Sequence, residues 1–127
     1  EYCYAQMFSG CSELTTAPAL PATTLAEYCY AQMFSGCSEL TTAPTLPAET
    51  LAFGCYNEMF SGCTALSSVT MLATDVSAEA EFCLENWLNE AGINVQGHPT
   101  LTLYNYEVYN NIRNYIPKNW RIQYKPQ

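Results

Sequence analysis

The first 112 residues contain no lysine and no arginine, because all four basic residues lie between positions 113 and 125. The twelve acidic residues all precede them, and the formal net charge is −8. Proteins that bind nucleic acids or anionic membrane surfaces do so through clustered positive charge. The sequence therefore predicts no nucleic-acid partner. Its acidity suits cations or basic partners, but the solubility of a secreted or surface protein is the simpler interpretation.

Long apolar runs are also absent. No segment approaches the roughly 18 apolar residues of a membrane span, so we expect no membrane insertion. The chain has no initial methionine and no signal-like segment, and it begins at Glu1 inside a repeat. We therefore expect a processed or trimmed piece of a longer protein.

Residues typical of catalysis are scarce. The single histidine, His98, lies in a Gly-His-Pro loop signal. Reactive thiols need an electropositive, accessible surrounding, which acidic repeats do not provide. The paired cysteines have seven residues between them, far from the spacing of about two to four residues in structural zinc sites. We expect no enzyme, no metal site and no cofactor.

What the chain has is a repeat. The segment CYAQMFSGC at Cys3–Cys11 returns unchanged at Cys29–Cys37, as CYNEMFSGC at Cys55–Cys63, and altered as CLENWLNEA at Cys83–Ala91. The first three copies start 26 residues apart and the fourth starts after 28. A fixed period of this size is typical of a solenoid, in which each repeat is one coil packed on its neighbours.

We name the successive repeats coils 1 to 4, at residues 1–26, 27–52, 53–80 and, in part, 81–92. The first part of each coil has apolar residues at helical spacing and predicts a short helix, which in coil 1 ends at Gly10. The second part is rich in threonine and predicts a short strand paired in parallel with the next coil. Prolines limit this strand to a few residues, and the third part returns the chain.

The cysteines fall into two columns if the coils stack. A column of identical residues in a solenoid is typical of a buried ladder, and free cysteine is among the most buried residue types. Bridges between neighbouring coils stay open, because paired strands lie about 5 Å apart and within disulfide reach. We favour reduced, buried thiols. The columns are Cys3, Cys29, Cys55 and Cys83, and Cys11, Cys37 and Cys63.

Residues 93–127 depart from the repeat. The stretch from Leu101 to Tyr124 has strand-like alternation, many aromatic residues and all the positive charge. A solenoid must cover its last coil with a segment whose outer face is polar. We therefore expect residues 93–127 to form a C-terminal cap that packs over Trp87 and Leu88, whereas coil 1 stays exposed.

With the coil written as C-Y-x-x-M-F-x-G-C-x-x-L-x-x-A-P-x-L-P-A-x-x-L, the chain resembles the BspA-like leucine-rich repeat proteins. It is most similar to their cysteine-rich variety in gut Bacteroidetes, which often ends with motifs like Cys83–Trp87 and Ile116–Trp120. The resemblance implies an α/β repeat: a leucine-rich-repeat solenoid of short helices and short parallel strands with a C-terminal cap. It also implies an extracellular or cell-surface location, associated with the outer membrane, and a role in adhesion or recognition.

Polar columns would lie on or beside the strand face, and the inner face of a solenoid is its usual binding surface. A solvated polar face without a ligand is the alternative. Tyr4, Tyr30 and Tyr56 suggest an aromatic strip for sugars, although packing explains them equally simply. The candidate ligand-binding residues are Glu13, Thr15, Thr16, Glu39, Thr41, Thr42, Ser67 and Ser68.

Two functions remain in view. The first is a non-enzymatic bacterial surface or secreted module that recognises a host or bacterial protein or a glycan. The second is a structural spacer that presents other domains of a longer surface protein. A cysteine-based enzyme is a distant third, and the sequence does not indicate the oligomeric state.

Overall fold

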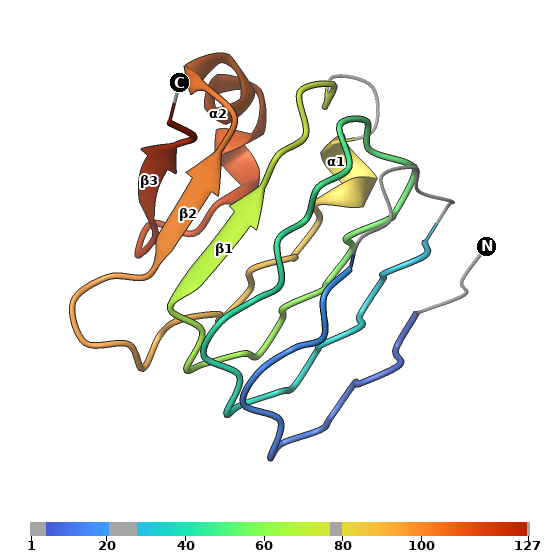
Figure 1. Ribbon diagram of the computed structural model, residues 1–127, viewed down its shortest axis with the longest axis vertical. Coiled ribbons are helices and arrows are strands. Elements are labelled where there is room, and N and C mark those ends of the chain that lie inside the picture. The colour runs from blue at the N-terminus through green and yellow to red at the C-terminus, as the bar shows by residue number, and fades with distance from the viewer. Residues whose placement is uncertain (1–4, 21–27, 77–79, 127) are drawn as a thin grey trace.

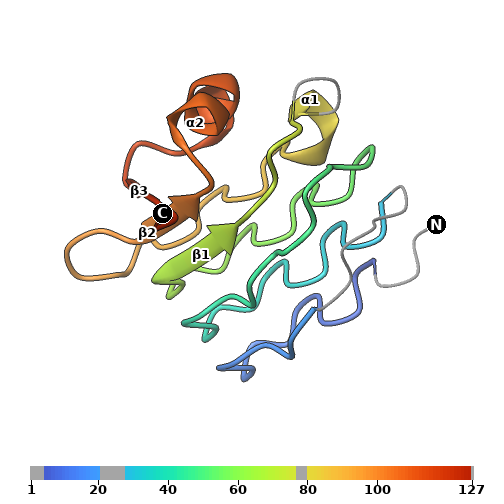
Figure 2. The same ribbon diagram turned by 45° about the horizontal axis from the view of Figure 1, so that its top comes forward.

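The computed structural model describes residues 5–20, 28–76 and 80–126. Turns and extended segments make up most of this chain, and the copies of the repeat lie side by side as successive layers (Figure 1). Figure 2 shows the layers running from coil 1, in blue, to the C-terminal elements, in red. The regular elements are β1 (Ser68–Met71), α1 (Ala80–Cys83), β2 (Thr100–Leu103), α2 (Tyr106–Ile112), the 3-10 helix η1 (Arg113–Tyr115) and β3 (Arg121–Tyr124).

One side of the stack is a parallel sheet in the order β1-β2-β3. Ser68 pairs with Thr100, which in turn pairs with Arg121. Towards the N-terminus the pairing continues as isolated parallel bridges. These join Thr16 to Thr42, Thr42 to Ser68, Leu46 to Met71, and Thr50 to Asp75.

Proline explains where the continuous strands begin. Coils 1 and 2 carry Pro18 and Pro44 at equivalent positions, and proline has no N–H to donate to a sheet. Coil 3 has Thr70 at this position, and it is the first coil to form a strand of several residues, β1. The length of the strands therefore follows one position of the repeat.

The opposite side of the stack is not helical in coils 2 and 3. The expected short helix is wrong there, and the chain makes overlapping turns instead. Even-numbered amides donate to the next coil, as Phe34 N–H does to the Met59 carbonyl at 3.0 Å. Odd-numbered amides donate three residues back, as Met33 N–H does to the Tyr30 carbonyl at 3.1 Å. The coils are thus joined by a ladder of backbone hydrogen bonds on this side as well.

Residues with positive φ recur every fourth position in these turn segments. In coil 2 they are Tyr28 (φ 55°), Gln32 (57°) and Gly36 (79°). A helix would commit its amides internally, whereas this geometry frees every second amide for the neighbouring coil. Gln32 is not a glycine, and its left-handed backbone costs roughly 1–2 kcal/mol. Its side-chain amide accepts from Gln6 and donates to Glu58 at 3.2 Å, so the ladder offsets this cost.

The core lies between the two sides. The repeated Cys, Met, Phe and Leu positions of coils 2 and 3 point into it, as predicted. The phenylalanine rings stack from coil to coil, with centroids 5.5 Å apart for Phe8 and Phe34 and 5.8 Å for Phe34 and Phe60. Coil 1 has no coil in front of it in this structure, and Met7 is 59% exposed.

The C-terminal residues complete the same core. Trp87 and Leu88 are fully buried, and the Trp87 indole donates to the Tyr115 carbonyl at 2.9 Å. The Trp120 indole donates to the Ala91 carbonyl at 3.2 Å. Leu101 and Ile112 join the cluster of buried residues that extends through coils 2, 3 and 4. The assignment of the whole arrangement to the leucine-rich-repeat class stays a prediction.

Candidate functional site

The outward side of the parallel sheet carries two rows of polar side chains, which we call the hydroxyl face. Burial alternates along β1 and β2, so every second side chain points away from the core. Strand register and bridges then align the outward residues into rows. The first row is Thr16, Thr42, Ser68, Thr100 and Arg121, and the second is Thr70, Thr102 and Gln123.

Three of the predicted ligand-binding residues belong to this face. Thr16 and Thr42 are exposed and Ser68 is half-buried, and the parallel bridges place them in register. Their hydroxyl groups can both donate and accept hydrogen bonds. The structure therefore brings these three positions together in one row.

Three other predicted residues, at the preceding positions, connect neighbouring coils. The Ser67 hydroxyl donates to the Thr41 carbonyl at 2.8 Å, and the Thr41 hydroxyl approaches the Thr15 carbonyl at 3.4 Å. Backbone amides of Thr41 and Ser67 donate to the same two carbonyls. Thr41 and Ser67 therefore support the stack, although all three residues are exposed.

The remaining predicted residues are Glu13 and Glu39. Both are exposed and lie in turns that end at Leu14 and Leu40, whose amides donate three residues back. These turns precede the strand positions, so the two carboxylates flank the hydroxyl face without belonging to its rows. They give the N-terminal end of the face a negative border.

Five residues of the face were not among the predicted ligand-binding residues: Thr70, Thr100, Thr102, Arg121 and Gln123. They belong to coil 3 and to the segment after the last recognisable repeat. The alternation of Thr and Leu at 100–103 is the signal for the strand β2. The sequence gave no register for that strand relative to coil 3, because the repeat spacing ends before it.

The buried cysteines are poor nucleophiles. The Cys63 thiol donates to the Phe34 carbonyl at 3.0 Å, and Cys37 donates to the Phe8 carbonyl at 3.1 Å. Burial raises the pKa of Cys63 to about 12, with a further contribution from the nearby Cys37 thiol. Burial also raises the pKa of Cys55, whose Sγ atom lies 2.6 Å from that of Cys83. These thiols stay protonated at neutral pH.

All six cysteines that the structure describes are free, and Cys3 lies outside the described residues. Five are buried, but Cys11 is exposed, which corrects the expectation that nearly all thiols are inaccessible. Cys11 belongs to coil 1, and the carbonyl that its equivalents bind would come from a preceding coil. Its exposure therefore follows from its place at the end of the stack.

His98 does not meet a cysteine. It is exposed, and its Nδ1 lies 3.1 Å from the Asn119 carbonyl. Among the described residues, no group of three or more His, Cys, Asp or Glu side chains could hold a metal ion. Over the same residues, no helix is long and apolar enough to cross a membrane.

The tyrosine column is a packing feature. Tyr30 and Tyr56 are buried, and their rings stack with centroids 6.3 Å apart. Tyr4 lies outside the described residues. A sugar could not reach the two buried rings, so the hydroxyl face is the stronger candidate for ligand binding.

Comparison of the chain with protein-family models, with curated proteins and with solved structures found no match.

Proposed function

We propose that the chain is a non-enzymatic recognition module of the leucine-rich-repeat type from a bacterial surface or secreted protein, and that it binds a protein or a glycan. The observation that carries this proposal is the hydroxyl face, with its in-register row from Thr16 to Arg121. Parallel pairing repeats one side chain at the strand spacing of about 4.8 Å. A ligand with many hydroxyl or amide groups can form several hydrogen bonds with such a row.

The charges of the face favour a polar, uncharged or weakly charged ligand. Arg121 stands at one end of the first row, and Glu13 and Glu39 border the other end. Hydroxyl groups dominate between them, and they carry no charge of their own. A neutral oligosaccharide or a polar peptide segment fits this distribution better than a polyanion does.

The chemistry of the cysteines supports a non-enzymatic role. Thiolates are the reactive form, and burial keeps the described thiols of the inner coils protonated. The one histidine lies against a backbone carbonyl rather than beside a thiol. Recognition requires none of these groups to react.

A glycan microarray of bacterial and host-surface oligosaccharides, with a parallel panel of host matrix proteins, tests the proposal. The double variant Thr70→Tyr/Thr102→Tyr places bulk on two paired positions of the face and keeps residues that favour strands. It should weaken binding of any captured ligand by about tenfold or more. The control Thr74→Tyr changes an exposed residue outside the two rows and should bind normally.

The spacer alternative is favoured by a different observation, the exposed first coil. Met7 is 59% exposed, and the equivalent Met33 is covered by coil 1. Such an end accepts a further repeat without any change of contacts, which suits an extendable array. Absence of any ligand on both panels, together with unchanged cell adhesion when the face is blocked, would favour the spacer.

A further inference from the structure

A row of unpaired backbone amides lies on coil 4. In coils 1 to 3 the equivalent amides all donate to the next coil; for example, Glu58 N–H donates to the Glu85 carbonyl at 3.0 Å and Phe60 N–H to the Trp87 carbonyl at 2.9 Å. One coil further on, the equivalent amides belong to Asn86, Leu88 and Glu90. None of the three donates a hydrogen bond within the part of the chain that the structure describes.

The direction of these amides follows from the geometry of the repeat. Carbonyls of Glu85, Trp87 and Asn89 accept from coil 3, and the intervening amides therefore point to the opposite side. Asn86 and Glu90 have φ values of 54° and 60°, close to the 52° of the equivalent Glu58. Coil 4 thus presents a row of donors at the place where the ladder would continue.

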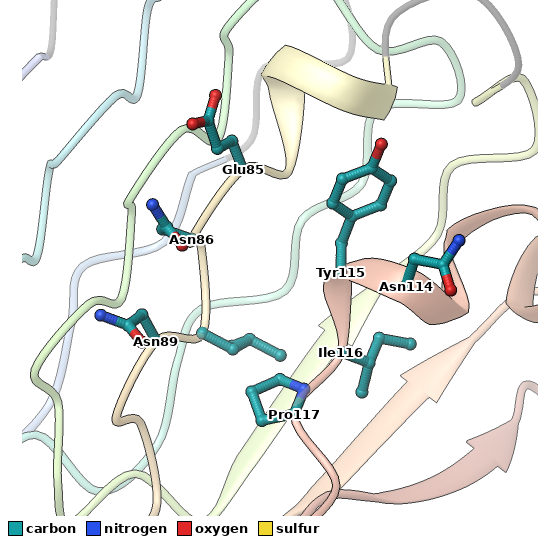
Figure 3. A pocket seen from close by; sticks show the side chains of 8 residues that line it. Glu85, Asn86, Asn89, Asn114, Tyr115, Ile116 and Pro117 are labelled. Carbon is teal, nitrogen blue, oxygen red and sulfur yellow. The ribbon is translucent and has the colours of Figure 1, made fainter.

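A pocket of about 340 Å³ lies beside this row. Its walls come from coil 4 on one side and from residues 114–117 of the C-terminal segment on the other (Figure 3). Leu88, Ile116 and Pro117 provide apolar surface, while the side chains of Asn89 and Asn114 provide amide groups. This volume is at the lower end of the range for ligand pockets, about 300–1,000 Å³.

The C-terminal segment covers coil 4 without using these donors. It reaches the coil through side chains, because the indole of Trp87 donates to the Tyr115 carbonyl and the indole of Trp120 donates to the Ala91 carbonyl. Residues of α2 and η1 occupy the next layer, and helical carbonyls are bonded within their own helix. A helix therefore cannot replace the row of carbonyls that coils 2, 3 and 4 each offer to the coil before them.

We infer that this pocket binds a short extended peptide segment, whose alternate carbonyls accept from the amides of Asn86 and Leu88. The same row of donors binds backbone carbonyls at every other step of the stack, so the ligand continues an interface that the protein already has. Alternate carbonyls of an extended chain point to one side, which matches donors two residues apart. The inference goes beyond the hydroxyl face, which lies on the other side of the stack.

The probe is a blocked tetrapeptide, acetyl-Ala-Val-Ala-Lys-amide, which has no negative charge to oppose the acidic chain. Titration is followed by the amide NMR signals of the whole chain. Saturable shifts at Asn86, Leu88 and Glu90, with a Kd on the order of 1 mM, are expected. An ester in place of the accepting amide is a weaker acceptor and should weaken binding several-fold.

Two matched variants locate the peptide. Asn114→Trp fills the pocket from an exposed position and should abolish the shifts. Asn110→Trp changes an exposed asparagine of α2 that does not line the pocket and should leave them intact. Shifts confined to other residues, or none at about 10 mM peptide, would overturn the inference.

Two further outcomes would also overturn it in favour of another occupant. Equal shifts with acetate alone would make the row a carboxylate site. Shifts of the same three amides on raising the protein concentration, together with shifts in coil 1, would indicate that a second copy occupies the row.

Discussion

A single hydroxyl group in the core lacks a hydrogen bond. Tyr56 is fully buried, stacks on Tyr30, and has no partner for its hydroxyl among the described residues. An unsatisfied buried polar group costs about 1–3 kcal/mol, whereas its ring contributes packing. The residue is therefore retained for its ring, and its hydroxyl opposes folding.

Tyr56→Phe should raise the free energy of unfolding by about 1 kcal/mol, because it removes the unsatisfied hydroxyl and keeps the ring. Urea denaturation of the two proteins measures the difference. Tyr30→Phe is the matched comparison, since the Tyr30 side of the stack is less completely enclosed. A Tyr56→Phe protein that is less stable than the parent would show that the hydroxyl has a partner in solution.

The cysteines make the stability depend on alkaline pH. The pKa of Cys63 is raised from 9.0 to about 12 by burial, and burial also raises the pKa of Cys37 and of Tyr56. A raised folded-state pKa gives stability that is complete below the unfolded value and is lost as the pH rises towards the folded value. Stability should therefore decline from about pH 9 to pH 12.

Cys63→Ser tests this dependence, because serine keeps a donor near the Phe34 carbonyl but does not titrate in this range. The variant should show a shallower decline of stability between pH 9 and about 11 than the parent, measured by urea denaturation at each pH. A parent whose stability is constant over this range would contradict the buried, protonated state of the thiol.

At the scale of one element, the turn after coil 4 depends on a glycine. Gly92 has φ +73°, and a Cβ there would lie 2.7 Å from the Pro99 Cγ and 2.9 Å from the Leu66 carbonyl oxygen. Its own amide donates to the Cys63 carbonyl at 3.0 Å. The glycine therefore allows the fourth coil to close on the third.

Gly92→Ala should cost roughly 2–3 kcal/mol, from the left-handed backbone and from contact with a backbone oxygen that cannot move freely. Gly97→Ala is the control, because Gly97 has φ +81° but nothing within 4 Å of the added Cβ. Its cost should be limited to about 1–2 kcal/mol. Equal losses for the two variants in thermal unfolding would remove the contact from the explanation.

The turn segments show where sequence reasoning succeeded and where it failed. The buried positions were predictable, because Cys29, Met33 and Cys37 recur every four residues. The backbone was not, because a four-residue period over nine residues cannot be distinguished from the 3.6-residue period of a helix. Gly36 was expected to have positive φ, but nothing in the sequence marks Gln32 for the same conformation.

The candidate binding face was predictable only in part, for a related reason. The repeat spacing fixes the row through Thr16, Thr42 and Ser68, which the sequence alone indicated. Thr100 and Arg121 join that row through the pairing of β2 and β3, and no repeat spacing leads to them. The free amides of coil 4 depend on how the C-terminal segment packs, which the sequence does not encode locally.

At the scale of the whole molecule, the two ends of the stack differ. Coil 1 leaves Met7 exposed, whereas Trp87 at the corresponding position of coil 4 is completely buried under the C-terminal segment. That segment supplies Leu101, Leu103 and Ile112 to the shared core. The stack is thus closed at one end and open at the other.

Deleting residues 101–127 should lower the melting temperature and promote aggregation. The deletion removes two strands of the sheet and uncovers Trp87, and an exposed strand edge with apolar surface favours association. Differential scanning fluorimetry and light scattering on the 1–100 chain measure both effects. A truncated chain that is monomeric and equally stable would show that these residues are an appendage.

The most direct test of the account is the NMR scalar coupling across backbone hydrogen bonds in coil 2. The account predicts that the Phe34 amide couples to the carbonyl carbon of Met59, and the Gln32 amide to that of Asn57, each 25 residues ahead. A short helix in this segment would instead couple Phe34 to Tyr30, four residues back. Detection of the long-range pair supports the stacked ladder of turns, and detection of the local pair would contradict it.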